Sequence, residues 1–243
     1  MNTSIITQKD ILANVIHAHY NVLIVLDRMG INLGFGNKTV AQVAELHGVD
    51  PGALIVILNL FCNNEYVPNV ENHFNYIPDF LRYLKKSHHH FLEEKIPAIQ
   101  QNIQKLVHLL HDSKAEMVDS FYNKYIEEIT EHIEYENETV FPFVEEIYDA
   151  FLNKRDPSSL LKEYDIDIYH EHHDDIEIIL KDLKNILIRH LPQKEEGRTR
   201  MIVLEQLFDL ESDLFSHTRI EDEVLTPLVK RLEEKIRPLM KPI

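Results

Sequence analysis

Residues 132–142 of the chain read His-Ile-Glu-Tyr-Glu-Asn-Glu-Thr-Val-Phe-Pro, and residues 217–227 read His-Thr-Arg-Ile-Glu-Asp-Glu-Val-Leu-Thr-Pro. In both stretches, glutamates follow the histidine four and six residues later, and a proline follows it ten residues later. Residues four apart lie on one face of a helix, so a histidine and its first glutamate can reach the same point. Imidazole with carboxylate suits iron, manganese or zinc. The repeat therefore predicts two metal-binding helices, with ligands at His132, Glu136, His217 and Glu221.

The spacing of the repeat points to further histidine ligands. The two stretches are 85 residues apart, which suggests a duplicated pair of helices. His88 precedes His132 by 44 residues, and His173 precedes His217 by the same interval. Ile176 and Leu180 follow His173 at positions +3 and +7, which places His173 on the predicted buried face of its helix.

The ligand from the first long helix is either His88 or His89. His88 lies between Leu84 and Leu92, each four residues away, whereas His89 has apolar residues at +3 and +7, as His173 does. Adjacent helical positions differ by about 100°, so only one of the two can point inward. We favour His88 and retain His89 as the alternative.

A single His/Glu pair at a spacing of four is weak evidence for a metal. The pairs His89/Glu93, His90/Glu94 and His173/Glu177 have the same spacing and are typical of exposed helix surfaces. A polar core without metal is the alternative to a metal site, although burying such groups without a cation is costly.

The distribution of glycine predicts an all-α fold. Five of the six glycines lie before residue 53, and long segments without glycine favour long helices because glycine costs a helix about 1 kcal/mol. We expect a small helical domain over residues 1–65, a linker over 66–77, and an up-down-up-down four-helix bundle over 78–243. Short connections make sequential helices antiparallel neighbours. The bundle helices are expected at about residues 78–111, 114–152, 158–191 and 199–235.

Local signals refine these helices. In the small domain, a helix over residues 10–29 should end near Gly30, Thr39 should cap the next helix, and Asp50-Pro51 should begin another. Prolines 97, 142 and 227 are expected to bend or stop the long helices.

Composition excludes several function classes. The net charge of −16 repels nucleic-acid phosphates and anionic lipid. No apolar run approaches the ~20 residues that span a membrane, and the first ten residues do not resemble a signal peptide. The single cysteine, Cys62, excludes a disulfide framework. We therefore expect a cytoplasmic protein that binds neither nucleic acid nor membrane.

The order His, His-x-x-x-Glu-x-x-x-x-Phe-Pro, His, His-x-x-x-Glu resembles the hemerythrin-like cation-binding domain. More narrowly, the chain is similar to the repair-of-iron-centres proteins, which join such a bundle to a small N-terminal helical domain. The resemblance implies two non-haem iron ions bridged by an oxygen species (oxo or hydroxo) and by Glu136 and Glu221, with manganese or zinc as substitutes. It implies the remaining ligands His88 (or His89), His132, His173 and His217. The family's paired cysteines are replaced here by Leu33 and Gly34.

The resemblance implies a role in the response to nitric oxide or oxidative damage, in which the protein repairs iron–sulfur clusters. The expected partners are a small gas, nitric oxide or dioxygen, together with iron–sulfur proteins and a second copy of the chain as a homodimer. The alternative is reversible binding or sensing of dioxygen or nitric oxide without turnover. A bundle that only stores a metal is the third hypothesis.

Overall fold

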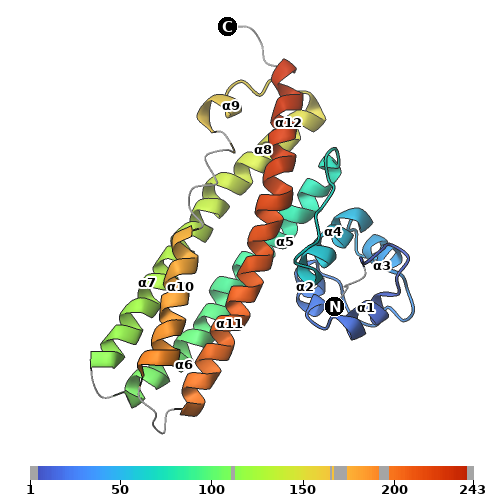
Figure 1. The fold of residues 1–243 in the computed structure, drawn as a ribbon. Helices are drawn as coiled ribbons and strands as arrows, with labels where there is room; N and C mark the ends of the chain where they lie inside the picture. The colour runs from blue at the N-terminus through green and yellow to red at the C-terminus, as the bar shows by residue number, and fades with distance from the viewer. Residues whose placement is uncertain (1–4, 111–112, 165, 167–173, 192–196, 240–243) are drawn as a thin grey trace. The chain divides into compact units, whose positions relative to one another are not determined.

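The computed structural model describes residues 5–110, 113–164, 166, 174–191 and 197–239, and every element named within these ranges is a helix (Figure 1). The only β-pairing there is an isolated bridge between Ile11 and Thr39. The predicted all-α class is therefore confirmed. None of the described helices has both the length and the apolar character needed to cross a membrane.

The chain divides into two compact units. The first comprises residues 1–87, 140–168 and 216–243, and the second comprises residues 88–139 and 169–215. The residues that were expected to form a separate small domain, 1–65, belong to the first unit.

The first unit begins with four short helices: α1 (Leu12–Ala18), α2 (Val22–Arg28), α3 (Val40–Leu46) and α4 (Pro51–Cys62). Thr39 caps α3, because its Oγ1 accepts a hydrogen bond from Gln42 N while the Gln42 side chain accepts one from Thr39 N. Asp50 caps α4 by accepting from Gly52 N at 2.7 Å. Both helix starts confirm the sequence prediction.

The single helix predicted over residues 10–29 is wrong. It is divided into α1 and α2, because the backbone leaves the helical conformation at His19. The predicted end is confirmed, since Gly30 follows α2 with φ of +70°, a conformation that glycine adopts without strain.

The first unit also contains further helices from later in the chain. They are α5 (Ile77–His90), α8 (Phe141–Asn153), α9 (Leu160–Glu163) and α12 (Thr226–Ile236), with 3₁₀ turns at η1 (Phe74–Tyr76) and η7 (Arg237–Leu239). Helix α5 belongs to the first unit as far as Ser87. Helix α12 packs against α8 and against η1. An ion pair of 2.6 Å joins Lys85 of α5 to Glu145 of α8.

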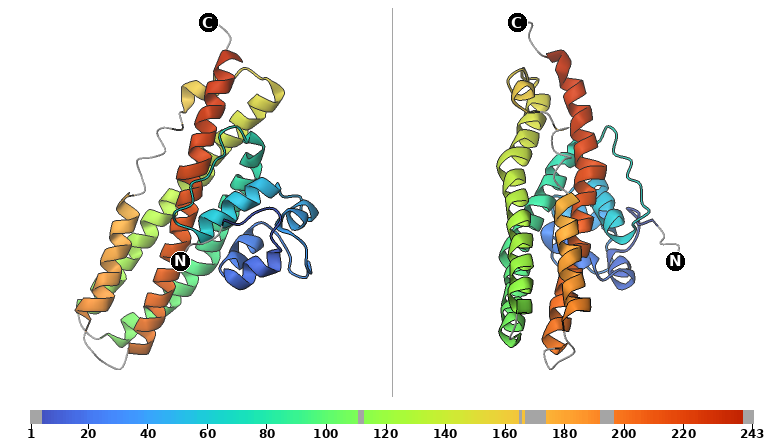
Figure 2. Two further views of the ribbon diagram at one scale, coloured as in Figure 1. Left: turned by 45° about the vertical axis from the view of Figure 1, so that its right-hand side comes forward. Right: turned by 60° about the vertical axis from the view of Figure 1, so that its left-hand side comes forward.

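The second unit is built around one apolar core. Its helices are α6 (Ile96–Leu109), α7 (Ser113–Tyr135), α10 (Asp174–Asn185) and α11 (Gly197–Ile220) as far as Phe215. Helix α7 packs against both α6 and α10, and Figure 2 shows α7 and α10 running alongside one another. All four helices contribute fully buried side chains to the core, among them Ile103, Tyr122, Leu183 and Leu207.

Four π-helical turns lie in the described helices: η2 (Phe91–Lys95), η3 (Glu136–Val140) and η6 (Glu221–Leu225) each stand between two α-helices, and η5 (Ile186–His190) ends α10. In the sequence, a proline stands two residues after each turn, at positions 97, 142, 192 and 227. Proline cannot donate a hydrogen bond, and its ring clashes with the carbonyl four residues earlier, whereas a π turn spaces its bonds five residues apart. Prolines 97, 142 and 227 accordingly lie in the first turns of α6, α8 and α12, and the helices do not stop there.

Candidate metal centre

The two repeated motifs adopt the same local structure. His132 lies in the last turn of α7 and Glu136 begins η3, while His217 lies in the last turn of α11 and Glu221 begins η6. Nε2 of His132 lies 3.2 Å from Oε1 of Glu136, and Nε2 of His217 lies 3.0 Å from Oε1 of Glu221. The spacing of four thus brings each histidine to its own glutamate, as the helical period requires.

His88 approaches the same glutamate as His132. Its Nε2 lies 3.1 Å from Oε2 of Glu136, so the two carboxylate oxygens face two different imidazoles. Its Nδ1 lies 2.9 Å from the side-chain oxygen of Asn137. If Nδ1–H donates to this amide oxygen, Nε2 presents its lone pair, which is how hydrogen bonds outside a metal site orient its histidine ligands.

His89 points away from this glutamate. Its side chain is 54% exposed, and Nδ1 lies 2.9 Å from Oε1 of Glu93. His90 pairs in the same way with Glu94 at 3.1 Å. Of the two histidines that the sequence left open, the structure therefore places His88 inward and His89 on the surface, so His89 does not belong to the site.

Four buried side chains form a group that can hold a metal ion: His88, Glu136, His217 and Glu221. Each offers one ligand atom, and these atoms all lie within 4.8 Å of one another. His132 lies beside Glu136 but is not a member of this group, and its side chain is 14% exposed. His173, the ligand predicted from the third long helix, lies outside the described residues.

The chemistry of this donor set fits a divalent metal. Two ligand atoms held at a right angle by bonds of about 2.1 Å are about 3.0 Å apart, which is close to the measured His–Glu separations. A divalent cation between the two buried carboxylates would offset their negative charge, which is costly to bury. The mixture of imidazole and carboxylate favours iron, manganese or zinc over calcium or magnesium.

Glu136 is held in the ionised form that a metal ligand requires. Burial by itself would raise its pKa, but the hydrogen bonds and charges of His132 and His88 outweigh burial and hold the pKa well below its usual range. The pKa of Cys62 shifts in the opposite direction, since burial raises the pKa of its thiol to about 11. A thiol with that pKa is protonated at neutral pH and is a poor metal ligand.

Two features of the site escaped the sequence prediction. Asn137 directly follows a predicted ligand, and only its contact with His88 shows its role. Glu223, the glutamate six residues after His217, pairs with Arg219 at 2.7 Å and does not face the group.

Comparisons with known proteins identify no relative from which a function could be inferred. No protein-family model matches the chain, and no curated protein matches it either. A function must therefore be inferred from the burial and the donor chemistry of the four-residue group.

Proposed function

We propose that this chain is a non-haem iron protein whose long helices form an up-down-up-down four-helix bundle of the hemerythrin kind. The observation that carries the proposal is the buried group of His88, Glu136, His217 and Glu221, whose ligand atoms lie within 4.8 Å of one another. Imidazole and carboxylate ligands suit iron in both common oxidation states, and burial of the ligands strengthens their electrostatic attraction to the ion.

A second iron ion would use the carboxylate of Glu136 as a bridge. Its Oε1 faces His132 and its Oε2 faces His88, so each oxygen has an imidazole to share an ion with. Carboxylates that face two ligand sets in this way commonly join paired metal ions about 3.5–4 Å apart. His173, which precedes His217 by 44 residues in the sequence, is proposed as a further ligand.

The proposed activity is the binding of nitric oxide or dioxygen as part of a response to nitrosative or oxidative damage, with repair of iron–sulfur clusters as the outcome. Histidine and carboxylate ligands supplied in this number leave coordination positions for a gas molecule. Reversible gas binding or sensing without turnover is the alternative. The two are distinguished by adding the iron-loaded protein to a damaged iron–sulfur protein, since only the repair role restores the cluster.

Metal analysis of the protein purified without oxygen tests the proposal. We expect about two iron ions per chain, with an absorption spectrum that changes on oxidation. His88→Ala and His217→Ala should each lose most of the iron, because each removes a buried ligand of the group. His89→Ala is the matched control, since it is the neighbouring histidine on the exposed surface and should retain the wild-type iron content.

Two results would count against the assignment. Full iron content in both His88→Ala and His217→Ala would show that the group does not hold the metal. Equal losses in His89→Ala would show that the first helix presents a different face from the one described.

A further inference from the structure

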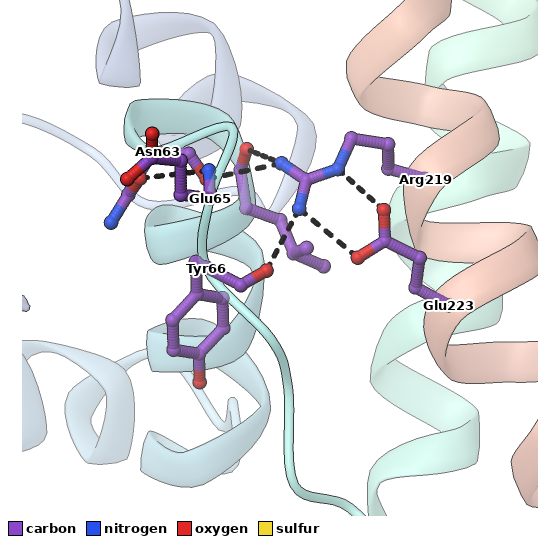
Figure 3. A network of polar contacts seen from close by, with 6 residues as sticks. Asn63, Glu65, Tyr66, Arg219 and Glu223 are labelled. Atoms are coloured by element: carbon purple, nitrogen blue, oxygen red, sulfur yellow. Dashed lines mark hydrogen bonds and ion pairs between the residues drawn. The ribbon is translucent and has the colours of Figure 1, made fainter.

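Arg219 lies on α11 between the two proposed ligands His217 and Glu221, yet it faces other partners (Figure 3). Its Nε and Nη2 donate to the two carboxylate oxygens of Glu223 at 2.7 and 3.0 Å. Its Nη1 donates to the carbonyl oxygens of Leu60 and Asn63 at 2.9 and 3.1 Å, and Nη2 donates to that of Tyr66 at 2.9 Å. A guanidinium has five N–H donors, and these contacts use all of them.

Two of the carbonyls that Arg219 binds, those of Leu60 and Asn63, lie at the end of a helix, and the third, that of Tyr66, lies in the segment that follows it. Helix α4 ends at Cys62, and the last carbonyls of a helix lack partners within it and carry its negative dipole end. A buried cation that satisfies them is favourable, and Arg219 is only 7% exposed. Arg219 therefore completes the end of α4 from a position on α11, about 155 residues later in the chain.

The segment after α4 is tied a second time. Arg231 of α12 donates to the carbonyl oxygen of Glu71 at 3.5 Å and to its carboxylate at 3.1 Å. This pair holds the pKa of Glu71 below its usual value. We call residues 63–71 the strap. Between the two arginines that tie it lies the π turn η6, whose first residue is Glu221.

Only one of the repeated motifs has this device. The position two residues after the histidine is Arg219 in one motif and Glu134 in the other, and Glu134 is exposed. The glutamates at the sixth position, Glu223 and Glu138, are both exposed, and Glu223 is the one that pairs with Arg219. The chain thus contains its own matched control for the strap.

We propose that Arg219 is a positioning residue that couples the strap to the retention of metal. The α-helical hydrogen-bond pattern changes register within the π turn, so the orientation of His217 relative to Glu221 depends on what holds that turn from outside. Arg219 links that turn to the end of α4, because it donates both to Glu223 within the turn and to the carbonyl of Leu60. Coupling between two sites is reciprocal, so bound metal also strengthens the docking of the strap. The metal half of this inference rests on the proposed function, whereas the docking half does not.

The test uses the full chain and two readouts. Metal release from the loaded protein to a chelator should be about tenfold faster in Arg219→Gln than in wild type, within the usual range of coupling between sites. Amide hydrogen exchange of residues 60–66 should slow when metal is added to wild type, and should not respond in the variant. Arg219→Lys should fail to restore wild-type release, because an ammonium cannot reproduce the five-donor fork. Glu134→Gln, the matched control, should behave as wild type.

Each outcome decides one part of the inference. Wild-type rates of metal release in Arg219→Gln, with faster exchange at residues 60–66, would overturn the coupling and leave a purely structural tie. If wild type takes up no metal, the proposed function fails, and exchange in the metal-free protein still decides the docking. In the metal-free protein, amide hydrogen exchange of residues 60–66 must be faster in Arg219→Gln than in wild type. Equal exchange would refute the docking of the strap by Arg219. Glu223→Gln, which retains the arginine, repeats both readouts should Arg219→Gln not fold.

Discussion

Two tyrosines in the core of the second unit should respond oppositely to the loss of their hydroxyl groups. Tyr122 and Tyr125 are both 0% exposed and lie three residues apart on α7. The hydroxyl of Tyr122 donates to the carbonyl oxygen of Ile96 at 3.1 Å. Within the described part of the chain, the hydroxyl of Tyr125 has no hydrogen-bond partner. Burial, together with the charge of Glu211, raises the pKa of Tyr125, so its hydroxyl stays protonated and neutral.

The magnitudes follow from these contacts. Burying an unsatisfied hydroxyl costs about 1–3 kcal/mol, so Tyr125→Phe should raise the free energy of unfolding by about 1 kcal/mol. Tyr122→Phe leaves the Ile96 carbonyl with one partner fewer and should lower the free energy of unfolding by about 1 kcal/mol. In a chain of this size, each change corresponds to a shift of Tm by about 2–4 °C, upward for Tyr125→Phe and downward for Tyr122→Phe.

Thermal and urea unfolding of the two variants, measured beside wild type, check the prediction. Equal destabilisation by Tyr125→Phe and Tyr122→Phe would refute it, because the hydroxyl of Tyr125 would then have a partner such as a bound water.

Two further predictions concern the first unit. Thr39→Ala should lower the free energy of unfolding by about 1 kcal/mol in urea titrations, because the capping box at the start of α3 is lost, and Thr39→Ser should retain most of the stability. Burial raises the pKa of Asp79 above its ordinary value of 3.8, even though its carboxylate accepts a hydrogen bond from Asp50 N. Between the pKa of Asp79 in the unfolded chain and its higher pKa in the native state, the native state binds more protons than the unfolded chain. The free energy of unfolding therefore falls as the pH rises through this window. Unfolding titrations against pH should show this fall in wild type and not in Asp79→Asn; parallel curves would contradict it.

The all-helical fold could be predicted because its signals are local. The caps at Thr39 and Asp50 and the long segments without glycine act within a few residues, so the sequence alone specifies them. The π turns were missed for a related reason. The prolines were visible, but a proline in a helix can produce a bend, an end or a π turn, and packing determines which one forms.

The choice between His88 and His89 shows where periodicity fails. The pattern that favoured His89 uses Leu92 and Ile96, and these positions are counted through the π turn η2. A π turn has more residues per turn than an α-helix, so the +3 and +7 positions no longer mark the same face. The residue that identifies His88 is Glu136, 48 residues away, and no local pattern connects the two.

Arg219 was beyond prediction for a different reason. Three of its four partners are the backbone carbonyls of Leu60, Asn63 and Tyr66, and a backbone carbonyl has no sequence signature. Its fourth partner, Glu223, forms an i,i+4 pair that resembles any exposed helix pair in the sequence.

The π turns also affect how this chain must be compared with other helical proteins. A π turn accommodates one residue more than the α-helical turn it replaces, and η3 and η6 both begin at a proposed ligand. An alignment to a bundle whose helices are α-helical throughout would therefore need a one-residue gap between Glu136 and Pro142, and another between Glu221 and Pro227. Without these gaps, the residues beyond each proline would be assigned to a face rotated by about 100°, and their core positions would be read as surface.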